Sequence, residues 1–310
     1  MSCRSKSVKL AAAMLLMTSL AHSEPQHGIL VREAVIRITP DDTSQRIGLA
    51  GRGREVVVLN QSHDWINVFA NVGPEKQITG WILNKGVVLP STPNGDKIVF
   101  AEAEDSEDQA SRSHGRPGAA QDAMHLYASL ADLLPKSQLA GEALYRAADI
   151  RWQIESADVM SLPSAREQDP ILRSKINEDY MREVIKKFPH TKWADLAAYH
   201  LLDNQLCGDW QGQSKCPERE TELYEKYVRE HPQSPKAAEA LYNAARRQAA
   251  LIEIYKTEND AGKSEQAKAK TTAIANQVEK DYADSTWANR ALLLAYKVDQ
   301  NIPTYGSAIE

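Results

Sequence analysis

The sequence predicts a multidomain protein in which a small all-β barrel precedes an all-α array of helical hairpins. Two observations carry this prediction. Residues 29–89 alternate Val, Ile and Leu with polar residues and are interrupted by Gly, as in short strands joined by tight turns. A twelve-residue phrase then occurs four times between residues 134 and 293, and such recurrence is typical of repeat architectures.

Residues 1–23 are predicted to form a cleavable signal peptide. An apolar run at 10–20 follows three basic residues: Arg4, Lys6 and Lys9. Ala21-His22-Ser23 offers small residues at positions −3 and −1 of a cleavage site. The run is shorter than the roughly 20 residues of a membrane-spanning helix. No Cys follows it, and Cys3 is lost on cleavage, so we expect a periplasmic or secreted protein without a lipid anchor or a transmembrane segment.

Residues 24–90 contain the predicted barrel. Its segments are an Arg-Pro strand at 34–40, a Gly-x-x-Val-x-Val strand at 53–59, a Trp-x-x-Val strand at 65–68 and a closing Gly-Trp-Ile at 80–82. Their order resembles a bacterial SH3-like domain. The resemblance implies that Trp65 and Trp81 form an aromatic groove for a peptide or a glycan. The alternative is that both side chains fill the core of a barrel with few other large residues.

Residues 91–119 are predicted to be an acidic, polar linker. The segment is rich in Ser, Asp, Glu, Gly and Pro, and five acidic residues are close together: Glu102, Glu104, Asp105, Glu107 and Asp108. So few apolar residues cannot bury enough surface to offset the entropy lost on ordering. The acidic cluster either docks a basic partner or is simply solvated.

The phrase marks the junction between one helix and the next. Its copies begin at residues 134, 188, 231 and 282. A large residue is followed by Pro, or by Ala in the fourth copy, and the missing N–H of Pro stops a helix. Position 4 is Ser or Thr, which can cap the next helix and is worth about 1 kcal/mol over Ala. Positions 7 and 10 are Ala in every copy, which allows a neighbouring helix to come close.

Apolar residues at helical spacing place the helices between the phrases, for example Met181, Val184 and Phe188. First helices are expected at about 137–155, 191–206, 234–257 and 285–299. A leading helix is expected at about 120–134, and second helices at about 171–188, 218–231 and 264–282.

The phrase resembles the junction of tetratricopeptide repeats, in the form found in periplasmic proteins of the outer-membrane assembly and tol-pal coordinator types. The resemblance implies that residues 120–310 form stacked hairpins that bind protein partners. The copies are 54, 43 and 51 residues apart, whereas a tetratricopeptide repeat has 34. The extra residues fall at 156–170, 207–217 and 256–263, so we expect three insertions on one edge of the array.

Cys207 and Cys216 are predicted to form a disulfide across the second insertion. Both remain after signal cleavage, and the predicted compartment is oxidising. Closing so short a loop is worth roughly 2.5–3 kcal/mol in the chain-entropy model. A metal site is the first alternative, although two sulfurs without a neighbouring His make it incomplete. A catalytic thiol is the second, although no Cys-x-x-Cys pair supports it.

No catalytic residue, metal site or cofactor is predicted. The chain has no His-Glu-x-x-His, no Gly-x-Ser-x-Gly, no phosphate-binding loop and no dinucleotide fingerprint. Its 37 basic and 42 acidic residues give a net charge of −5, which is not the balance of a nucleic-acid-binding protein.

The first helices carry polar residues that are candidate partner contacts. In the repeats that this chain resembles, first helices line the concave side of the array. The candidates are Arg151, Trp152, Lys192, Arg246, Arg247 and Asn289. They could hold an acidic or extended peptide, and an ordinary solvated surface explains them equally well.

These observations favour an exported, non-enzymatic scaffold that binds protein or peptide partners in the cell envelope through its barrel and repeats. The alternative is a module whose barrel binds peptidoglycan while the repeats recruit or regulate a cell-wall hydrolase. An enzyme with an unrecognised site is a third class, against which the missing motifs argue.

Overall fold

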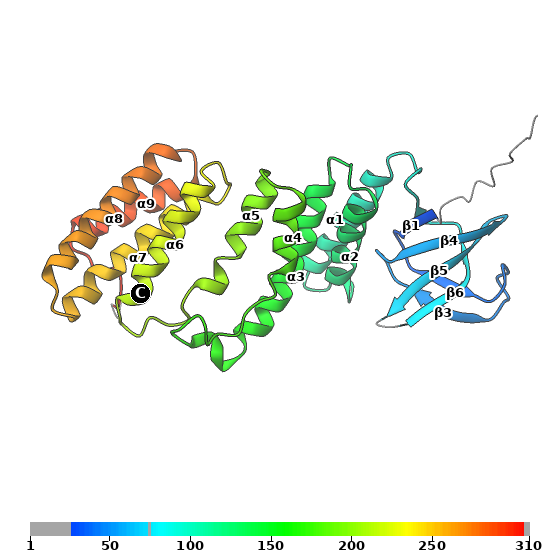
Figure 1. Ribbon diagram of the computed structural model, residues 1–310, viewed down its shortest axis with the longest axis horizontal. Helices are drawn as coiled ribbons and strands as arrows, with labels where there is room; N and C mark the ends of the chain where they lie inside the picture. Colours follow the sequence, from blue (N-terminus) through cyan, green and yellow to red (C-terminus); the bar gives the residue numbers. More distant parts are fainter. Residues whose placement is uncertain (1–25, 74–75, 307–310) are drawn as a thin grey trace, which may run out of the picture.

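The computed structural model describes residues 26–73 and 76–306, and the predicted signal peptide lies outside them. The molecule is elongated, with a seven-stranded antiparallel sheet at one end and helices that follow in chain order toward the other (Figure 1). We call residues 26–88 the sheet domain and helices α1 to α9 the helical array. None of the helices in the described ranges is long and apolar enough to cross a membrane.

The sheet domain confirms a small all-β region. Its strands are β1 (Gln26–Leu30), β2 (Ala34–Arg37), β3 (Arg46–Ala50), β4 (Glu55–Ser62), β5 (Trp65–Gly73), β6 (Lys76–Leu83) and β7 (Val87–Val88). They are ordered β3-β2-β6-β5-β4-β1-β7 in a sheet that curls on itself. Successive side chains of a strand point to opposite faces, so alternate residues fill the core. The core includes Leu30, Ile36, Val56, Ile66, Val68 and Ile82.

Residues 91–119 are not the polar linker that their composition predicts. Helix α1 (Gly95–Ser111) occupies most of the segment and packs against α2 (Ala119–Leu133). Val99, Phe100 and Ala103 are buried in this contact. Composition misled here because a few apolar residues on one face are enough to dock a helix against its neighbours.

The sheet domain is packed directly onto the helical array. Ile29 of β1 and Val88 of β7 belong to the same buried cluster as residues of α1 and α2. Arg52 Nε, in the β3–β4 turn, lies 3.1 Å from Glu102 Oε1 of α1. The Ser129 hydroxyl of α2 donates a hydrogen bond of 2.7 Å to the Gly53 carbonyl. The sheet domain therefore covers the first helices of the array.

The expected helices all have counterparts. After α1 and α2 come α3 (Ala140–Met160), α4 (Asp179–Lys187), α5 (Lys192–His200), α6 (Lys215–Glu230), α7 (Ala237–Thr257), α8 (Ala261–Asp281) and α9 (Thr286–Asp299).

Helix α3 extends to Met160 instead of residue 155, and two other helix ends also differ clearly from the prediction. Helix α4 begins at Asp179 instead of residue 171, and α5 ends at His200 instead of residue 206. The Asn204 side chain explains both differences. Its Oδ1 accepts from the Ile176 N–H at 3.0 Å, and its Nδ2 donates to the Ile176 carbonyl at 2.8 Å. These bonds satisfy the backbone of an irregular segment that would otherwise need a helix or water.

The repeated alanines are confirmed as packing positions. All eight are buried in the structure: Ala140, Ala143, Ala194, Ala197, Ala237, Ala240, Ala288 and Ala291. A methyl group at these positions lets adjacent helices approach, as the phrase predicts.

The hydroxyl at phrase position 4 caps the following helix in two of the four copies, at Thr191 before α5 and at Ser285 before α9. In all four copies the hydroxyl accepts a backbone N–H two or three residues later. In copies one and three this N–H belongs to Leu139 or Lys236, which precede the first helical residue, so no side chain caps α3 or α7. The bonds are Leu139 N to Ser137 at 3.1 Å, Ala194 N to Thr191 at 3.3 Å, Lys236 N to Ser234 at 3.1 Å and Trp287 N to Ser285 at 3.2 Å.

Consecutive repeats also contact each other through a fixed pair of phrase positions. The tyrosine at position 12 of one copy packs on the residue at position 6 of the next. The pairs are Tyr145 with the Trp193 ring at 5.6 Å, Tyr199 with the Lys236 ammonium at 5.4 Å, and Tyr242 with the Trp287 ring at 5.1 Å. The phrase therefore encodes contacts between repeats as well as the turn.

Candidate interaction sites

Trp65 and Trp81 lie on the outer face of the sheet domain. Trp65 pairs with Leu83 across β5 and β6, and Trp81 pairs with Asn67. Their neighbours Ile66 and Ile82 point to the opposite face and fill the core. Both tryptophans are half-buried and neither belongs to the core cluster. Filling the barrel therefore does not explain either side chain.

A small recess of about 140 Å³ adjoins Trp65. Trp65, Leu83, Val35 and Ala34 supply its apolar lining, and its charged lining residues are Arg32, Arg37, Lys85, Glu33 and Asp42. Arg37 is held in place because its Nη1 donates to the Ser44 carbonyl at 2.6 Å. Trp81 is not part of this lining. An apolar wall with three cations suits a peptide group that carries a carboxylate.

Two of the three expected insertions, the α3–α4 connection (161–178) and the α5–α6 connection (201–214), meet on one edge of the helical array. The third expected insertion was wrong, because the α7–α8 connection spans only residues 258–260 and the extra residues lengthen α7 and α8 instead. The α3–α4 connection lies at the lower edge in the view of Figure 1. It contacts the α5–α6 connection, where the Gly208 N–H donates to the Glu167 carbonyl at 2.9 Å. The Ser214 N–H in turn donates to Glu258 Oε1 at 3.0 Å, beside the end of α7. We call these three connections the insertion edge.

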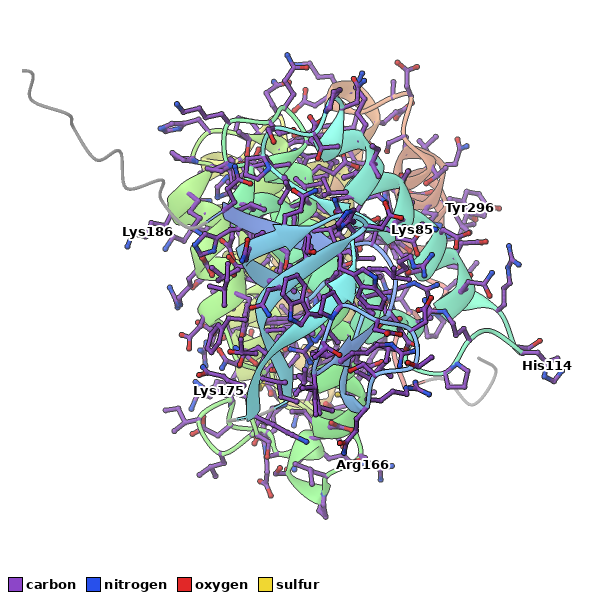
Figure 2. All side chains as sticks on the ribbon, turned by 90° about the vertical axis from the view of Figure 1, so that its right-hand side faces the viewer. Lys85, His114, Arg166, Lys175, Lys186 and Tyr296 are labelled. Carbon is purple, nitrogen blue, oxygen red and sulfur yellow. A yellow bond between two sulfur atoms is a disulfide. The ribbon has the colours of Figure 1, made fainter. Side chains whose placement is uncertain are left out.

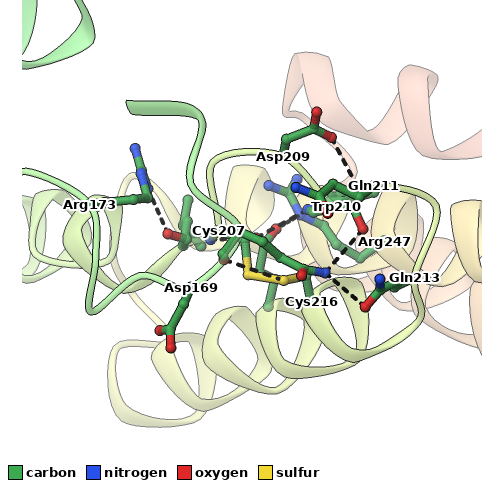
Figure 3. Close-up of a disulfide and its surroundings, with 12 residues drawn as sticks. Asp169, Arg173, Cys207, Asp209, Trp210, Gln211, Gln213, Cys216 and Arg247 are labelled. Atoms are coloured by element: carbon green, nitrogen blue, oxygen red, sulfur yellow. Dashed lines mark hydrogen bonds and ion pairs between the residues drawn. A yellow bond between two sulfur atoms is a disulfide. The ribbon is translucent and has the colours of Figure 1, made fainter. Parts of the chain in front are cut away.

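Cys207 and Cys216 form a disulfide at the centre of the insertion edge (Figure 3). Their Cα atoms are 6.1 Å apart, within the range that a disulfide requires. The pairing agrees with the sequence prediction. The bond closes the α5–α6 connection at the start of α6.

A buried carboxylate holds the disulfide loop onto the array. Glu220 Oε1 accepts from the Cys207 N–H at 2.9 Å and from the Trp210 Nε1 at 3.2 Å. Its Oε2 accepts from Arg247 Nε of α7 at 3.0 Å. A buried charge is stable only when it is paired and hydrogen-bonded, and Glu220 meets both conditions. Arg247, proposed from sequence as a partner contact, therefore serves an internal role.

Arg151 and Trp152 are likewise engaged within the protein. Arg151 lies over the Tyr180 ring at 3.9 Å and donates to Glu155 Oε1 at 2.7 Å. Trp152 is buried, and its Nε1 donates to Asp203 Oδ2 at 3.3 Å. The contact of each residue with a following segment stabilises the junction between hairpins.

Three other sequence candidates remain exposed. Lys192 lies over the ring of the adjacent Trp193 at 4.2 Å, while Arg246 and Asn289 are exposed on α7 and α9. The structure does not bring these three side chains together into one site.

Sequence reasoning missed a polar cluster between α3 and α5. His200 Nε2 lies 3.0 Å from Asp149 Oδ1 and 3.3 Å from the Tyr145 hydroxyl. Surrounding protein atoms desolvate the Asp203 carboxyl and raise its pKa, although the residue keeps contact with solvent, and nearby His200 opposes this shift. Asp149 and Asp203 occupy equivalent places in successive copies, fifteen residues after each phrase begins, and this equivalence was the available signal.

A second missed feature is a cavity of about 270 Å³ where the sheet domain meets α2. Its lining includes Phe69, Asn71, Arg54 and His125. Burial lowers the pKa of His125, and the nearby charge of Arg54 acts in the same direction. The imidazole is therefore held in its neutral form at this junction.

Across residues 26–73 and 76–306, no group of three or more His, Cys, Asp or Glu side chains is arranged to hold a metal ion. No protein-family model matches the chain, and no curated protein matches it. The resemblances to SH3-like domains and to tetratricopeptide repeats thus remain predictions, while a curled β-sheet followed by a helical array is the observed architecture.

Proposed function

We propose that the protein is an exported, non-enzymatic scaffold that binds protein or peptide partners in the cell envelope. The observation that carries the proposal is the outward position of Trp65 and Trp81, since large aromatic side chains on a surface are enriched where partners bind. The recess beside Trp65 adds cations at one end of this face. The helical array extends away from the sheet domain in an elongated molecule (Figure 1).

The binding face is tested by photo-crosslinking in intact cells. A photoreactive amino acid at position 65 or 81 of the full chain is expected to capture a partner. The same group at Lys186, an exposed residue of α4, serves as the control. Arg37→Glu should reduce capture at position 65, because it reverses a charge in the recess. Equal labelling at all three positions, or none at 65 and 81, would contradict the proposal.

A second candidate function is peptidoglycan binding by the same face. Arg32, Arg37 and Lys85 around the Trp65 recess favour it, because the peptide stems of peptidoglycan end in carboxylates. The full chain should then sediment with isolated peptidoglycan, and Trp65→Ala and Arg37→Glu should each release it. Capture of a protein at position 65 without sedimentation would favour the scaffold function alone.

A further inference from the structure

The outer face of α9 is exposed and mostly apolar, with the polar side chain of Asn289 also on it, three residues before Leu292 and four before Leu293. Leu292, Leu293 and Tyr296 lie at helical spacing on one side of the helix and are 42%, 56% and 60% exposed. The opposite side, with Ala288, Ala291 and Leu294, packs into the array. Figure 2 shows Tyr296 at the molecular surface. A repeat array normally needs a polar outer face on its last helix, so this face calls for an explanation.

In the earlier repeats, the residues equivalent to Leu292 and Tyr296 are much less exposed. Leu292 is at phrase position 11, whose equivalents Leu144 and Leu241 are only 5% and 3% exposed. Tyr296 lies fourteen residues after the start of its copy, and the equivalent residues Ala148, Leu202 and Ala245 are all buried. In copies one to three, these positions are buried or, at Ala198 of copy two, half-buried, and they belong to or pack against the core clusters of the array.

The same difference between α9 and the earlier repeats is found at phrase position 12. Tyr145, Tyr199 and Tyr242 each contact position 6 of the next copy. Leu293 stands at this position in α9 and is more than half exposed. The outer face of α9 therefore repeats, position by position, the face on which α3, α5 and α7 receive the following elements.

The charges beside this face restrict what it can accept. Arg290 and Lys297 lie three residues before and four residues after Leu293, so they flank it along one border of the face. Arg290 lies over the Trp287 ring at 4.5 Å. Asp299 is the one acidic residue of α9, and it lies on the other border of the face, beside Leu292.

These charges argue against an antiparallel two-fold pairing with a second copy of the same chain. In a two-fold antiparallel pairing of α9 with α9, the border that carries Arg290 and Lys297 meets the same border of the partner. Like charges would then be placed together at the rim of the contact, which is unfavourable.

We propose that the outer face of α9 binds an amphipathic helix of a partner protein, with acidic residues along the border that meets Arg290 and Lys297. The partner helix continues the stacking of the array and covers Leu292, Leu293 and Tyr296. Contact between single helices buries less than a standard interface of roughly 1,200–2,000 Å², so binding should be weak and reversible. This surface is separate from the Trp65 recess, and it requires no ligand there.

The proposal is tested with two synthetic helical peptides and the full chain. Both peptides carry the same leucine face, and they differ only in having Glu or Lys along its borders. Fluorescence anisotropy should show binding of the Glu peptide at least about tenfold tighter than the Lys peptide at low salt. Leu293→Asp should abolish binding without changing the melting temperature, because the side chain is largely exposed.

Two further variants make the test specific. The double change Arg290→Glu with Lys297→Glu should reverse the preference, so that the Lys peptide binds better. Ile171→Ser, a change of an exposed apolar residue on the insertion edge, should leave binding unaltered. Equal affinity for both peptides, no binding of either, or binding that survives Leu293→Asp would overturn the proposal. Self-association of the wild type that Leu293→Asp abolishes would assign the face to a second copy and also overturn it.

Discussion

At the residue scale, small side chains set the distances between elements. The alanines at phrase positions 7 and 10 are buried in all four copies. Gly53 has φ of +69°, and a Cβ there would lie 2.5 Å from the Leu126 backbone nitrogen of α2. At each of these places the contact between elements leaves no room for a larger side chain.

Ala240→Leu should destabilise the protein by roughly 1–3 kcal/mol, because overpacking forces neighbouring helices apart. Ala240 is fully buried between helices, whereas Ala283, in a junction turn, is exposed. Ala283→Leu is therefore the matched control and should change little. Urea unfolding followed by circular dichroism measures both. An unchanged midpoint for Ala240→Leu would show that the buried alanine tolerates the added volume.

His125 should make stability depend on pH. Burial lowers its pKa in the folded state, so below the ordinary His pKa of about 6.5 the unfolded chain binds more protons than the folded one. Stability should therefore fall as pH decreases through this value. His125→Gln should lose less stability than the wild type between about pH 7 and 5. Thermal unfolding across this range is the measurement, and parallel curves for the two proteins would contradict the assignment.

At the scale of elements, the insertion edge joins three connections that are distant in sequence. The disulfide closes one connection, and Glu220 fixes that connection to α6 and α7. The aromatic contact of Trp210 with Tyr305 at 5.6 Å adds the segment that follows α9. The long connections of the array are thereby tied to one another.

Replacing both cysteines with serine should lower the free energy of unfolding by about 2.5–3 kcal/mol, the chain-entropy cost of the opened loop. Helicity should remain, because the helices are held by packing elsewhere. Circular dichroism before and after denaturant titration measures both quantities. Protein isolated in its oxidised form should also show no free thiol at Cys207 or Cys216. A large loss of helicity would mean that the disulfide supports the entire array.

At the scale of the whole molecule, the sheet domain and the helical array form one continuous packed body. Ile29 and Val88 share a core with α1 and α2, and the Arg52–Glu102 pair and the Ser129–Gly53 bond surround it. The first end of the array is covered in this way, while α9 presents an apolar face at the other. The two ends are therefore chemically different.

Gly53→Ala should disrupt the docking of the sheet domain, since it combines an unfavourable φ with a collision against α2. Gly51→Ala is the control, because nothing lies within 4 Å of a Cβ at that position. In the wild type, limited proteolysis should spare α1 and cut first at the exposed turn near residue 114. Gly53→Ala should accelerate cleavage within 95–111. Early cleavage within 95–111 in the wild type would instead support the flexible linker that the composition of residues 91–119 predicts.

The sequence by itself determined the local rules of the molecule. The phrase specified the buried alanines, two of the four capping hydroxyls and the edge on which the first two insertions emerge, because each depends on neighbours a few residues away. The pairing of Cys207 and Cys216 was also predictable, because they are the two cysteines that remain after the predicted signal cleavage. The features of the phrase follow from local geometry and from the repeat.

Only the tertiary structure decided which polar and apolar residues face inward. Arg247 and Trp152 are bonded to Glu220 and Asp203, which are distant in sequence, so their roles could not follow from helix position alone. The segment containing α1 was ordered by contacts with α2 and β7, which its composition did not reveal. Trp65 and Trp81 were placed outside the core by strand register, because a shift of one residue would turn both inward.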